Sequence, residues 1–290
     1  MGANGGADLA SSFGAVAAEY DAARPSYPAA LLDAVEELAG RPLAGADVLD
    51  VGAGTGISAR ALLARGARVT AVEPTAGMAG RLRAVSPGLP LVRADGNALP
   101  FRDSSADLVT YAQAFHWTDP ARSVPEAVRV LRPGGALALW WNLKDRGVPW
   151  VREQSARMRA ACPRYHGHRP YGGSPEDLSR SGLRVSTAAV RWERRVPLGT
   201  ALLDQASRSY VAVLAPADRE RLLAAEREAL LAAFPDGVVV EPYVVELVVG
   251  VAAGAGAGAG AVDGSADGSA DGDADGSADG SANADGGARR

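Results

Sequence analysis

One short stretch of the sequence carries a histidine and a tryptophan where a strand is expected to end. Residues 113–119 read QAFHWTD and follow an apolar run at residues 107–111. Because open α/β sheets bind ligands at the carboxyl ends of their strands, His116 and Trp117 are candidates for the wall of a pocket. A histidine changes its charge near neutral pH, so His116 could also take a proton from a substrate hydroxyl. The sequence leaves both roles open.

A second candidate site is the glycine-rich stretch DVGAGTGI at residues 50–57. Its glycines would let the backbone approach a ligand closely, and the helix that follows would offer free N–H groups. A dinucleotide-binding turn needs G-x-G-x-x-G; Gly52 and Gly54 match that pattern, whereas the last position is Ile57. Glu73, which ends the second expected strand, could accept hydrogen bonds from both hydroxyls of a ribose. The stretch and the glutamate together predict a site for a cofactor that carries a ribose.

The elements around these stretches alternate between strand and helix. Apolar runs predict strands at residues 47–51, 68–72, 89–94, 107–111 and 136–141. Helical patterns are expected at residues 28–39, around 61–63, at 75–85 and at 120–131, the last ended by the breaker RPGG at 132–135. Strands separated by helices predict a parallel, doubly wound sheet.

The pattern changes after residue 142. Helices are expected at residues 149–161, 199–213 and 216–233, and strands at 184–196 and 243–249. Because no helix is expected between residues 238 and 249, the last strand should pair antiparallel with the preceding one. The predicted fold class is therefore α/β, a Rossmann-like doubly wound sheet of seven strands with an antiparallel final hairpin and helical cap elements.

The domain organisation follows from these patterns. Residues 1–40 form an arm and helices, and residues 41–249 form the main domain, with a cap at about 143–235. From residue 250 the chain alternates glycine and alanine and then repeats Ser-Ala-Asp-Gly, so it lacks apolar surface to offset its ordering entropy. We expect residues 250–290 to be disordered. DGDADG at 271–276 resembles the start of a calcium loop, but the place of its bidentate glutamate is taken by Ala282, and we expect no metal site.

Composition argues against several other classes of protein. Seven aspartates and two terminal arginines lie in the tail, and without them the net charge of −4 becomes +1. A body with so little charge predicts no nucleic-acid partner. The sequence has no apolar run of about 18 large side chains and no secretory-signal pattern at its start, so we expect no membrane span. The single cysteine, Cys162, suits a reducing compartment and predicts a cytoplasmic protein.

The combined motifs resemble those of class I S-adenosylmethionine (SAM) methyltransferases. The compressed Gly-x-Gly-x-Gly after Asp50 is similar to the first motif of that family, and LPF at 99–101, SADLV at 105–109 and LRPGG at 131–135 resemble later ones. YDAARPSYP at residues 20–28 is similar to the N-terminal arm of small-molecule methyltransferases of the ubiquinone/menaquinone and trans-aconitate types, or methyltransferase type 11. SRSY at 207–210 also resembles that subgroup. The resemblance covers roughly residues 10–249.

The resemblance implies transfer of a methyl group from SAM to an oxygen, nitrogen or carbon atom of a small-molecule acceptor. A sulfonium is already an activated electrophile, so positioning and exclusion of water should matter more than acid–base chemistry. Residues 113–117 also resemble a segment that family members with different acceptors share, which favours a pocket role for His116. The Ala-, Arg- and Gly-rich usage suggests a bacterial genome of high GC content, where such enzymes often serve specialised metabolism.

The resemblance also implies which residues meet the two ligands. In relatives the arm closes over SAM, which would bring Tyr20 and Arg24 to the methionine carboxylate, a partner that suits arginine. Asp95 would accept from the exocyclic amine of adenine. The implied cofactor-binding residues are Tyr20, Arg24, Asp50, Gly52, Ala53, Gly54, Glu73, Pro74, Met78, Asp95, Gly96, Asn97, Ala98, Gln113, Ala114 and Phe115. The implied acceptor pocket comprises Phe13, Tyr27, His116, Trp117, Trp141, Asn142 and Tyr210.

Other interpretations remain open. A SAM-binding protein could catalyse a non-methylating reaction such as cyclisation, because fold and cofactor do not fix the reaction. An NAD(P)-dependent oxidoreductase is a further alternative, against which Ile57 argues. His166 and His168 lack a carboxylate or cysteine partner at metal-binding spacing. The arginines of the cap region either line a solvated helix face or bind an acidic acceptor; they are Arg152, Arg157, Arg159, Arg164 and Arg169. The oligomeric state does not follow from the sequence.

Overall fold

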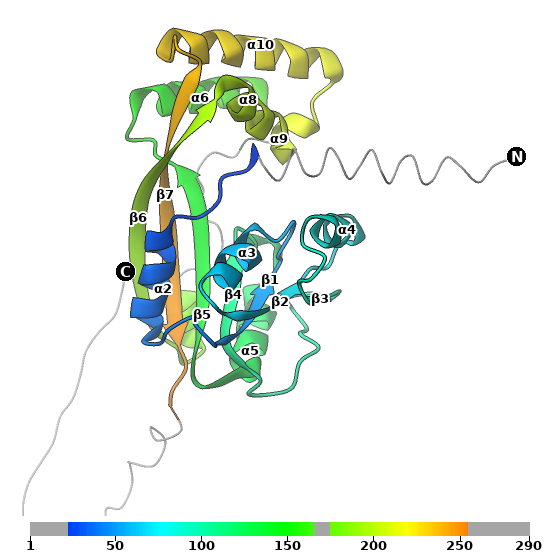
Figure 1. Ribbon diagram of the computed structural model, residues 1–290, viewed down its shortest axis with the longest axis vertical. Helices are drawn as coiled ribbons and strands as arrows, with labels where there is room; N and C mark the ends of the chain where they lie inside the picture. The colour runs from blue at the N-terminus through cyan, green and yellow to red at the C-terminus, as the bar shows by residue number, and fades with distance from the viewer. Residues whose placement is uncertain (1–22, 164, 166–174, 255–290) are drawn as a thin grey trace, which may run out of the picture. The chain divides into compact units, whose positions relative to one another are not determined.

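The computed structural model describes residues 23–163, 165 and 175–254. These residues contain a seven-stranded sheet in the order β3-β2-β1-β4-β5-β7-β6 (Figure 1). The pairings that join β3, β2, β1, β4 and β5 are parallel, whereas β7 runs antiparallel to both β5 and β6. The predicted α/β fold with an antiparallel final hairpin is confirmed. The strand order reverses direction between β1 and β4, which is where doubly wound sheets bind their ligands.

The strands follow the apolar runs of the sequence. They are β1 (Asp47–Val51), β2 (Arg68–Val72), β3 (Leu91–Val92), β4 (Ala106–Ala112), β5 (Leu131–Lys144), β6 (Arg184–Pro197) and β7 (Val238–Val251). Four of the five residues of β1 are buried, as expected for a central strand covered on both faces. Its register pairs Asp50 with Ala71 of β2 and with Thr110 of β4. The carboxyl ends of these three strands therefore lie side by side.

The helices occupy the connections between the strands. They are α2 (Ala29–Ala39), α3 (Ile57–Ala64), α4 (Ala76–Val85), α5 (Pro120–Val130), α6 (Pro149–Ala161), α7 (Pro175–Arg180), α8 (Leu198–Ala206), α9 (Ser209–Ala212) and α10 (Pro216–Ala233), with a 3-10 turn η1 (Phe115–Trp117). Proline stands in the first turn of α5, α6 and α10, where its missing N–H costs nothing. The Asp119 side chain caps α5 by accepting from the Ala121 N–H at 3.1 Å.

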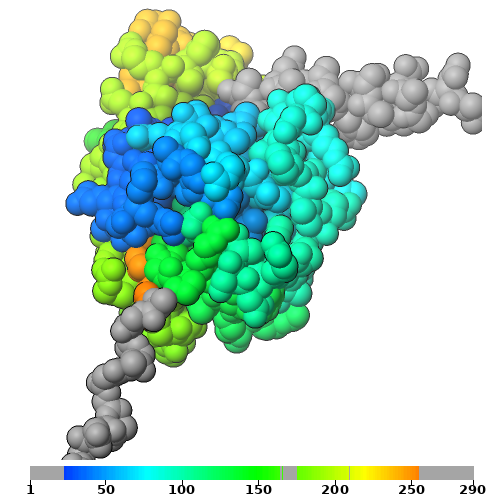
Figure 2. Space-filling model, turned by 60° about the horizontal axis from the view of Figure 1, so that its bottom comes forward, coloured from blue at the N-terminus to red at the C-terminus, as the bar shows by residue number. Residues whose placement is uncertain are grey.

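Two hydrophobic cores lie on the two faces of the sheet. One core contains Leu31 and Val35 of α2, Leu62 of α3 and Leu82 of α4, packed on residues such as Val48. The other contains apolar side chains of α5 and α7 packed on alternate strand positions, among them Leu49, Val109, Leu137 and Leu139. Because successive strand residues point to opposite faces, this alternation produces a three-layer α/β/α arrangement. Helix α2 contacts β5, β6 and β7, and its segment lies beside the end of β7 (Figures 1 and 2).

The last three strands carry the cap. β5, β6 and β7 have 14 residues each, far more than the other strands. They extend past the parallel part of the sheet to the helices α6, α8, α9 and α10 (Figure 1). The cap has small cores of its own, one around Met158, Val211 and Leu222 and another around Leu198 and Leu230. The cap is thus built on the end of the antiparallel hairpin.

Several predicted boundaries differ from the structure. β3 has two residues instead of the expected six, and β5 begins at Leu131 rather than at residue 136. Leu131 pairs with Ala106 across a register shift, so the segment through Pro133 is already extended. The helix expected at 199–213 is two helices separated at Ser207 and Arg208, and α7 was not expected. β7 begins at Val238, because it pairs with β6 as far as Pro197.

Candidate functional site

The glycine-rich turn between β1 and α3 has a backbone that glycine adopts readily. The φ angles of Gly52 and Gly54 are +70° and +57°, both in the left-handed region. The N–H groups of Gly52 and Ala53 donate to the Val72 carbonyl oxygen at 2.8 and 3.1 Å, which ties the turn to β2. A Cβ at Gly52 would lie 2.4 Å from the Cβ of Ala114. Close packing against the segment after β4 therefore requires the first glycine.

Gly54 differs from Gly52 because the place of its missing side chain borders open space. Apart from its chain neighbours, no described heavy atom lies within 4 Å of the Cβ that Gly54 would carry. Its N–H donates to Oε2 of Glu73 at 3.0 Å. The other oxygen, Oε1, accepts from the N–H and the hydroxyl of Thr75 at 2.9 and 2.7 Å. A carboxylate offers about four acceptor positions, so Glu73 can hold the turn and still accept from a ligand hydroxyl.

Asp50 is enclosed by the protein and is not exposed to a ligand. Its carboxyl is fully buried, and Oδ1 accepts from the hydroxyl of Thr110 at 2.8 Å. Burial raises the pKa of Asp50 to about 7, against the opposing effect of hydrogen bonds led by Thr110. Burial also raises the pKa of Tyr27 far above its usual range, and the charge of Asp50 adds to that shift. The Asp50 carboxyl, on β1, therefore lies close enough to Tyr27, in the segment before α2, to affect it electrostatically.

The turn after β3 is organised by hydrogen bonds of its own side chains. Oδ1 of Asp95 accepts from the backbone N–H and the side-chain amide of Asn97 at 2.9 and 3.0 Å. Asn97 in turn accepts from the N–H of Asp119 at 2.8 Å, and the Tyr111 hydroxyl donates to the Gly96 carbonyl at 3.2 Å. Asp95 itself remains exposed. The predicted adenine contact is thus a fixed turn with an accessible carboxylate.

Gln113, directly after β4, has a left-handed backbone with φ of +57°. For a residue with a side chain this conformation costs roughly 1–2 kcal/mol. Two hydrogen bonds hold it: the backbone N–H donates to the Trp140 carbonyl and the side-chain Nε2 to the Asn142 carbonyl, each at 2.9 Å. Strained residues of this kind gather at ligand sites. The conformation turns the chain so that Ala114 packs on the glycine turn.

The residues that follow form the turn η1. Phe115 is fully buried and packs edge-on against Tyr111, with ring centroids 5.2 Å apart. His116 is half-buried, and burial lowers the pKa of its imidazole below its ordinary value. Trp117 is 77% exposed, and its ring centroid lies 4.8 Å from that of His116. His116 therefore stands half-buried in the middle of the turn, beside the exposed ring of Trp117.

Asn142 joins the predicted acceptor pocket to the segment before α2. Its Oδ1 accepts from the indole N–H of Trp192 at 3.0 Å, and its Nδ2 donates to the Ser26 carbonyl at 3.4 Å. The neighbouring Trp141 is 4% exposed and belongs to the core on the α5 side of the sheet. Tyr27 packs edge-on against Trp140, with centroids 5.8 Å apart. Asn142, near the carboxyl end of β5, thus makes polar contacts with Gln113 after β4 and with Trp192 of β6.

The base of the cap contains a buried carboxylate surrounded by arginines. Asp204 of α8 is fully buried, and its Oδ2 accepts from Nη2 of Arg208 at 2.7 Å. Nε of Arg24 lies 3.7 Å from Oδ1 of Asp204, and Nη2 of Arg24 donates to the Ser207 carbonyl at 3.2 Å. Burial alone would raise the pKa of Asp204, but Arg208, Lys144 and Arg24 lower it below its ordinary value.

A second buried carboxylate lies on β7. Glu241 is fully buried and accepts from Lys144 at 3.0 Å, from Arg194 at 2.6 Å and from the Tyr243 hydroxyl at 2.9 Å. Nη1 of Arg194 donates to the Ala23 carbonyl at 2.9 Å. We name the six charged residues of this region the cap-base cluster: Arg24, Lys144, Arg194, Asp204, Arg208 and Glu241.

Of the cap-base cluster, only Arg24 is among the residues predicted for the site. Glu241 interrupts an apolar run in the sequence, and Asp204 and Arg208 stand four residues apart across a helix end. These signals indicate buried or paired charge, but they do not show that α8, β5, β6 and β7 meet. Tyr210, predicted for the pocket, packs against Tyr165 with centroids 4.9 Å apart. Burial raises the pKa of Tyr210 to about 12.

The remaining predicted residues lie near the turn or outside the described chain. Pro74 and Ala98 are exposed, and Met78 is half-buried in the first turn of α4. Phe13, Tyr20, Arg164, Arg169, His166, His168 and the calcium-like stretch lie outside the described residues. Arg157 pairs with the buried Glu226 at 2.5 Å, and Arg152 donates to the carbonyl oxygens of Arg146 and Gly147.

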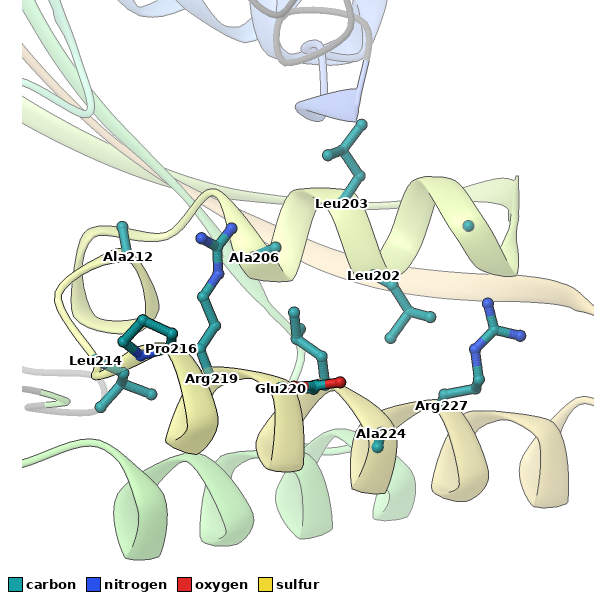
Figure 3. A pocket seen from close by; sticks show the side chains of 12 residues that line it. Leu202, Leu203, Ala206, Ala212, Leu214, Pro216, Arg219, Glu220, Ala224 and Arg227 are labelled. Carbon is teal, nitrogen blue, oxygen red and sulfur yellow. The ribbon is translucent and has the colours of Figure 1, made fainter.

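The cap also has an apolar groove between α8 and α10, with a volume of about 800 Å³ (Figure 3). Leu202 points from α8 toward α10, and Ala206, Leu214 and Ala224 add further apolar surface. Arg219, Glu220 and Arg227 of α10 supply the charged part of the lining. Among the residues that the structure describes, none of those predicted for the cofactor or the acceptor lines this groove.

The described residues fit SAM at the turn between β1 and α3. Gly54 leaves open space where a Cβ would stand, Glu73 has acceptor capacity beside it, and Asp95 is accessible. In the described part of the chain, no three His, Cys, Asp or Glu side chains are grouped so that they could hold a metal ion. No helix within the described ranges has the length and apolar character needed to cross a bilayer.

Comparisons with known proteins agree with this geometry. Residues 49–139 match the family model described as a methyltransferase domain. An uncharacterised methyltransferase of Mycobacterium tuberculosis strain H37Rv is 44% identical over 146 residues, which are 50% of this chain and 58% of that protein. The demethylmenaquinone methyltransferase of Clavibacter sepedonicus is 39% identical over 127 residues, 42% of this chain and 51% of that protein. The chain thus spans little more than half the length of these curated relatives.

Among solved structures, a protein from Anaeromyxobacter dehalogenans, named as a proposed type II methyltransferase, has a TM-score of 0.60 and 26% identity. The match covers 79% of this chain and 97% of that one. Residues 49–139 are therefore similar to a methyltransferase domain, and the chain shares its fold with that solved structure.

Proposed function

We propose that the protein is a SAM-dependent methyltransferase that acts on a small-molecule acceptor. The observation that carries this proposal is the pair formed by Gly54 and Glu73. Gly54 has a left-handed backbone, and the place of its missing side chain is open space. The Glu73 carboxylate accepts from the Gly54 N–H and can accept further hydrogen bonds from a ligand. The match of residues 49–139 to the methyltransferase domain supports the same assignment.

The chain's own residues would bind and orient the cofactor. Glu73 would accept from the ribose hydroxyls, and the Asp95 carboxylate with the backbone of residues 96–98 would hold the adenine. Arg24 would meet the methionine carboxylate. SAM, when bound, would supply a methyl group on a positively charged sulfur. An acceptor nucleophile in line with the carbon–sulfur bond would take the methyl group, and S-adenosylhomocysteine would leave. Catalysis then depends on positioning and on exclusion of water.

His116 fits a role in shaping the pocket better than a role as the catalytic base. Its ring packs against Trp117, with the two ring centroids 4.8 Å apart. Methyl transfer from a sulfonium requires little proton transfer. We therefore assign His116, together with Asn142 and Tyr27, to the wall between the cofactor end of the sheet and the cap.

The small-molecule acceptor is supported by the cap and by the relatives. The cap-base cluster and Asn142 bring charged and polar side chains close to the carboxyl ends of β4 and β5. The relative from Clavibacter sepedonicus is named for methylation of demethylmenaquinone, which is a small molecule. A cytoplasmic location and a part in bacterial specialised metabolism are consistent with the single cysteine and with the composition.

Calorimetric titration of the full chain tests the proposal. SAM and S-adenosylhomocysteine (SAH) should each bind with micromolar affinity, and NADH should not bind. Glu73→Ala should abolish binding, whereas Glu228→Gln, an exposed position on α10, should leave it unchanged. Binding of NADH alone would establish an oxidoreductase. Tight binding of SAM without transfer of labelled methyl to any acceptor in a broad screen would favour a non-methylating reaction.

A further inference from the structure

The cap-base cluster carries more positive than negative charge. It contains four cationic side chains, Arg24, Lys144, Arg194 and Arg208, against the two carboxylates of Asp204 and Glu241. The neighbouring pair of Arg157 and Glu226 is balanced and adds no net charge. The carboxylates are 1% and 0% exposed, and the cationic side chains are 13–23% exposed. Among the described residues, the cap-base cluster thus has more cationic than anionic side chains in a largely buried place.

Buried charge without a partner is costly, so such an excess needs an explanation. Removing an ion from water costs several kcal/mol, which is recovered only when charges and hydrogen bonds are satisfied. Nη2 of Arg194 is buried and has no hydrogen-bond partner among the described residues. The hydrogen bonds that the described structure gives the Arg208 side chain go to Asp204 alone. A bound anion would satisfy the remaining donors.

The cluster adjoins the cofactor end of the sheet. The pKa of Tyr27 responds to Asp50 of β1 and also to Arg24 and Arg208, so its hydroxyl lies within electrostatic reach of both regions. A second connection runs from Gln113 through Asn142 to Trp192, which stacks on Tyr243 with centroids 5.0 Å apart. An anion held at the cluster would therefore lie within electrostatic reach of the carboxyl end of β1, where we propose that the cofactor binds.

Arg208 is suited to recognise such an anion. Its side chain is 23% exposed, and Asp204, four residues earlier, fixes its orientation. A guanidinium is planar, always charged and able to form two parallel hydrogen bonds to a carboxylate or a phosphate. Arg208 also lies in the break between α8 and α9, so its side chain projects from a corner of the chain and not from the middle of a helix.

We propose that Arg208, oriented by Asp204, binds an anionic group, carboxylate or phosphate, of the methyl acceptor. The proposal rests on the proposed function and extends it to the chemical class of the acceptor. Within the cluster, Arg208 matches the anion of the acceptor, whereas Arg24 is assigned to the carboxylate of the cofactor. A carboxylate could come from either ligand, so the experiment must separate these two sources.

Titration of the SAH-saturated full chain with small probes makes that separation. Benzoate and inorganic phosphate carry the anion, and benzamide is the neutral counterpart of benzoate. We expect at least one of the two anions to bind with millimolar affinity and benzamide not to bind. Arg208→Gln should weaken anion binding roughly tenfold to a hundredfold, the range expected for loss of a charge-assisted hydrogen bond, and should change the SAH affinity less than twofold.

Two further variants control for loss of folding. Asp204→Asn combined with Arg208→Gln removes both charges, so no carboxylate is left unpaired, and this double variant should also lose the anion. Arg157→Gln removes an arginine from a buried carboxylate of the same cap outside the cluster, and it should retain anion binding. Circular dichroism and thermal unfolding should show that each variant is folded before titration.

The outcomes distinguish failure of this inference from failure of the proposed function. Failure of the unmodified protein to bind SAH would overturn the proposed function and, with it, the role of Arg208. Normal SAH binding without tighter binding of any anion than of benzamide would overturn only the inference. If Arg208→Gln instead weakens SAH but not 5′-methylthioadenosine, which lacks the amino-acid group, the carboxylate at Arg208 belongs to the cofactor and the inference is wrong.

Discussion

The cofactor end of the sheet and the base of the cap use different chemistry to make a site. At the cofactor end, backbone N–H groups, glycines with positive φ and the carboxylates of Glu73 and Asp95 border the place where we propose that the adenosine binds. At the base of the cap, six charged side chains from five parts of the chain form a field with an excess of positive charge. A site made from backbone can be shared by enzymes with one cofactor, whereas a site made from side chains can change with the acceptor.

The largest effect on this comparison is expected from the cap. Glu241→Gln removes the charge that Lys144 and Arg194 share in a fully buried place. Leaving those cations without a carboxylate should lower the free energy of unfolding by about 3–5 kcal/mol. Urea unfolding, followed by tryptophan fluorescence, measures the change. A loss below about 0.5 kcal/mol, the usual range for surface substitutions, would mean that the cluster is solvated and not buried.

The same variant also reports on acid sensitivity. Although burial raises it, the pKa of Glu241 lies below its ordinary value because Lys144 and Arg194 outweigh burial. A carboxyl with a lowered folded pKa stabilises the protein above its unfolded pKa and loses that contribution as the pH falls through the folded value. Glu241→Gln should therefore weaken the loss of stability on acidification.

A substitution in the glycine turn should lower the free energy of unfolding almost as much. Gly52→Ala places a Cβ 2.4 Å from the Cβ of Ala114 in a left-handed conformation, so stability should fall by about 2–5 kcal/mol. Gly54→Ala has the same backbone strain but no clash, so it should cost roughly 1–2 kcal/mol while blocking SAH. Gly40→Ala, also left-handed and without a clash, should cost as much as Gly54→Ala and leave SAH binding intact. Equal SAH affinity in all three variants would contradict the role assigned to the turn.

Asp50 provides a test by pH. Its folded pKa is about 7, and the unfolded value is about 3.9, so the folded protein holds the proton more tightly. The contribution of Asp50 to stability is therefore greatest below pH 4 and declines as the pH rises toward 7. Between pH 5 and pH 8 the decline should be about 3 kcal/mol, and Asp50→Asn should lack it. Parallel stability curves for the two proteins over this range would show that the carboxyl is not buried.

The sequence predicts the cofactor end of the sheet better than it predicts the base of the cap. β1, β2 and the glycine turn were predicted at their observed positions, because short-range patterns such as the apolar run 47–51 determine them. The cap-base cluster depends on Arg24, Asp204 and Glu241, which are far apart in the chain. Neither apolar periodicity nor spacing shows that these residues meet. The ends of β5 and β7 were missed for the same reason, since antiparallel pairing extends both strands beyond their apolar centres.

The smallest effect is expected at His116. If the imidazole only shapes the pocket, His116→Gln should lower kcat by less than about tenfold and leave the shape of the pH–rate profile unchanged. A general base would account for about 10²–10⁴ in rate, and its loss would remove the acidic limb of the profile. Initial rates with labelled SAM and an acceptor found by screening, measured from pH 5 to pH 9, distinguish the two roles.

A crystal structure of the full chain with SAH tests the central claim most directly. The account predicts that the ribose hydroxyls lie within hydrogen-bond distance of the Glu73 carboxylate, with the adenine beside Asp95 and the open space at Gly54 filled. An adenosine bound elsewhere, for example in the groove between α8 and α10, with the turn between β1 and α3 empty, would contradict the account.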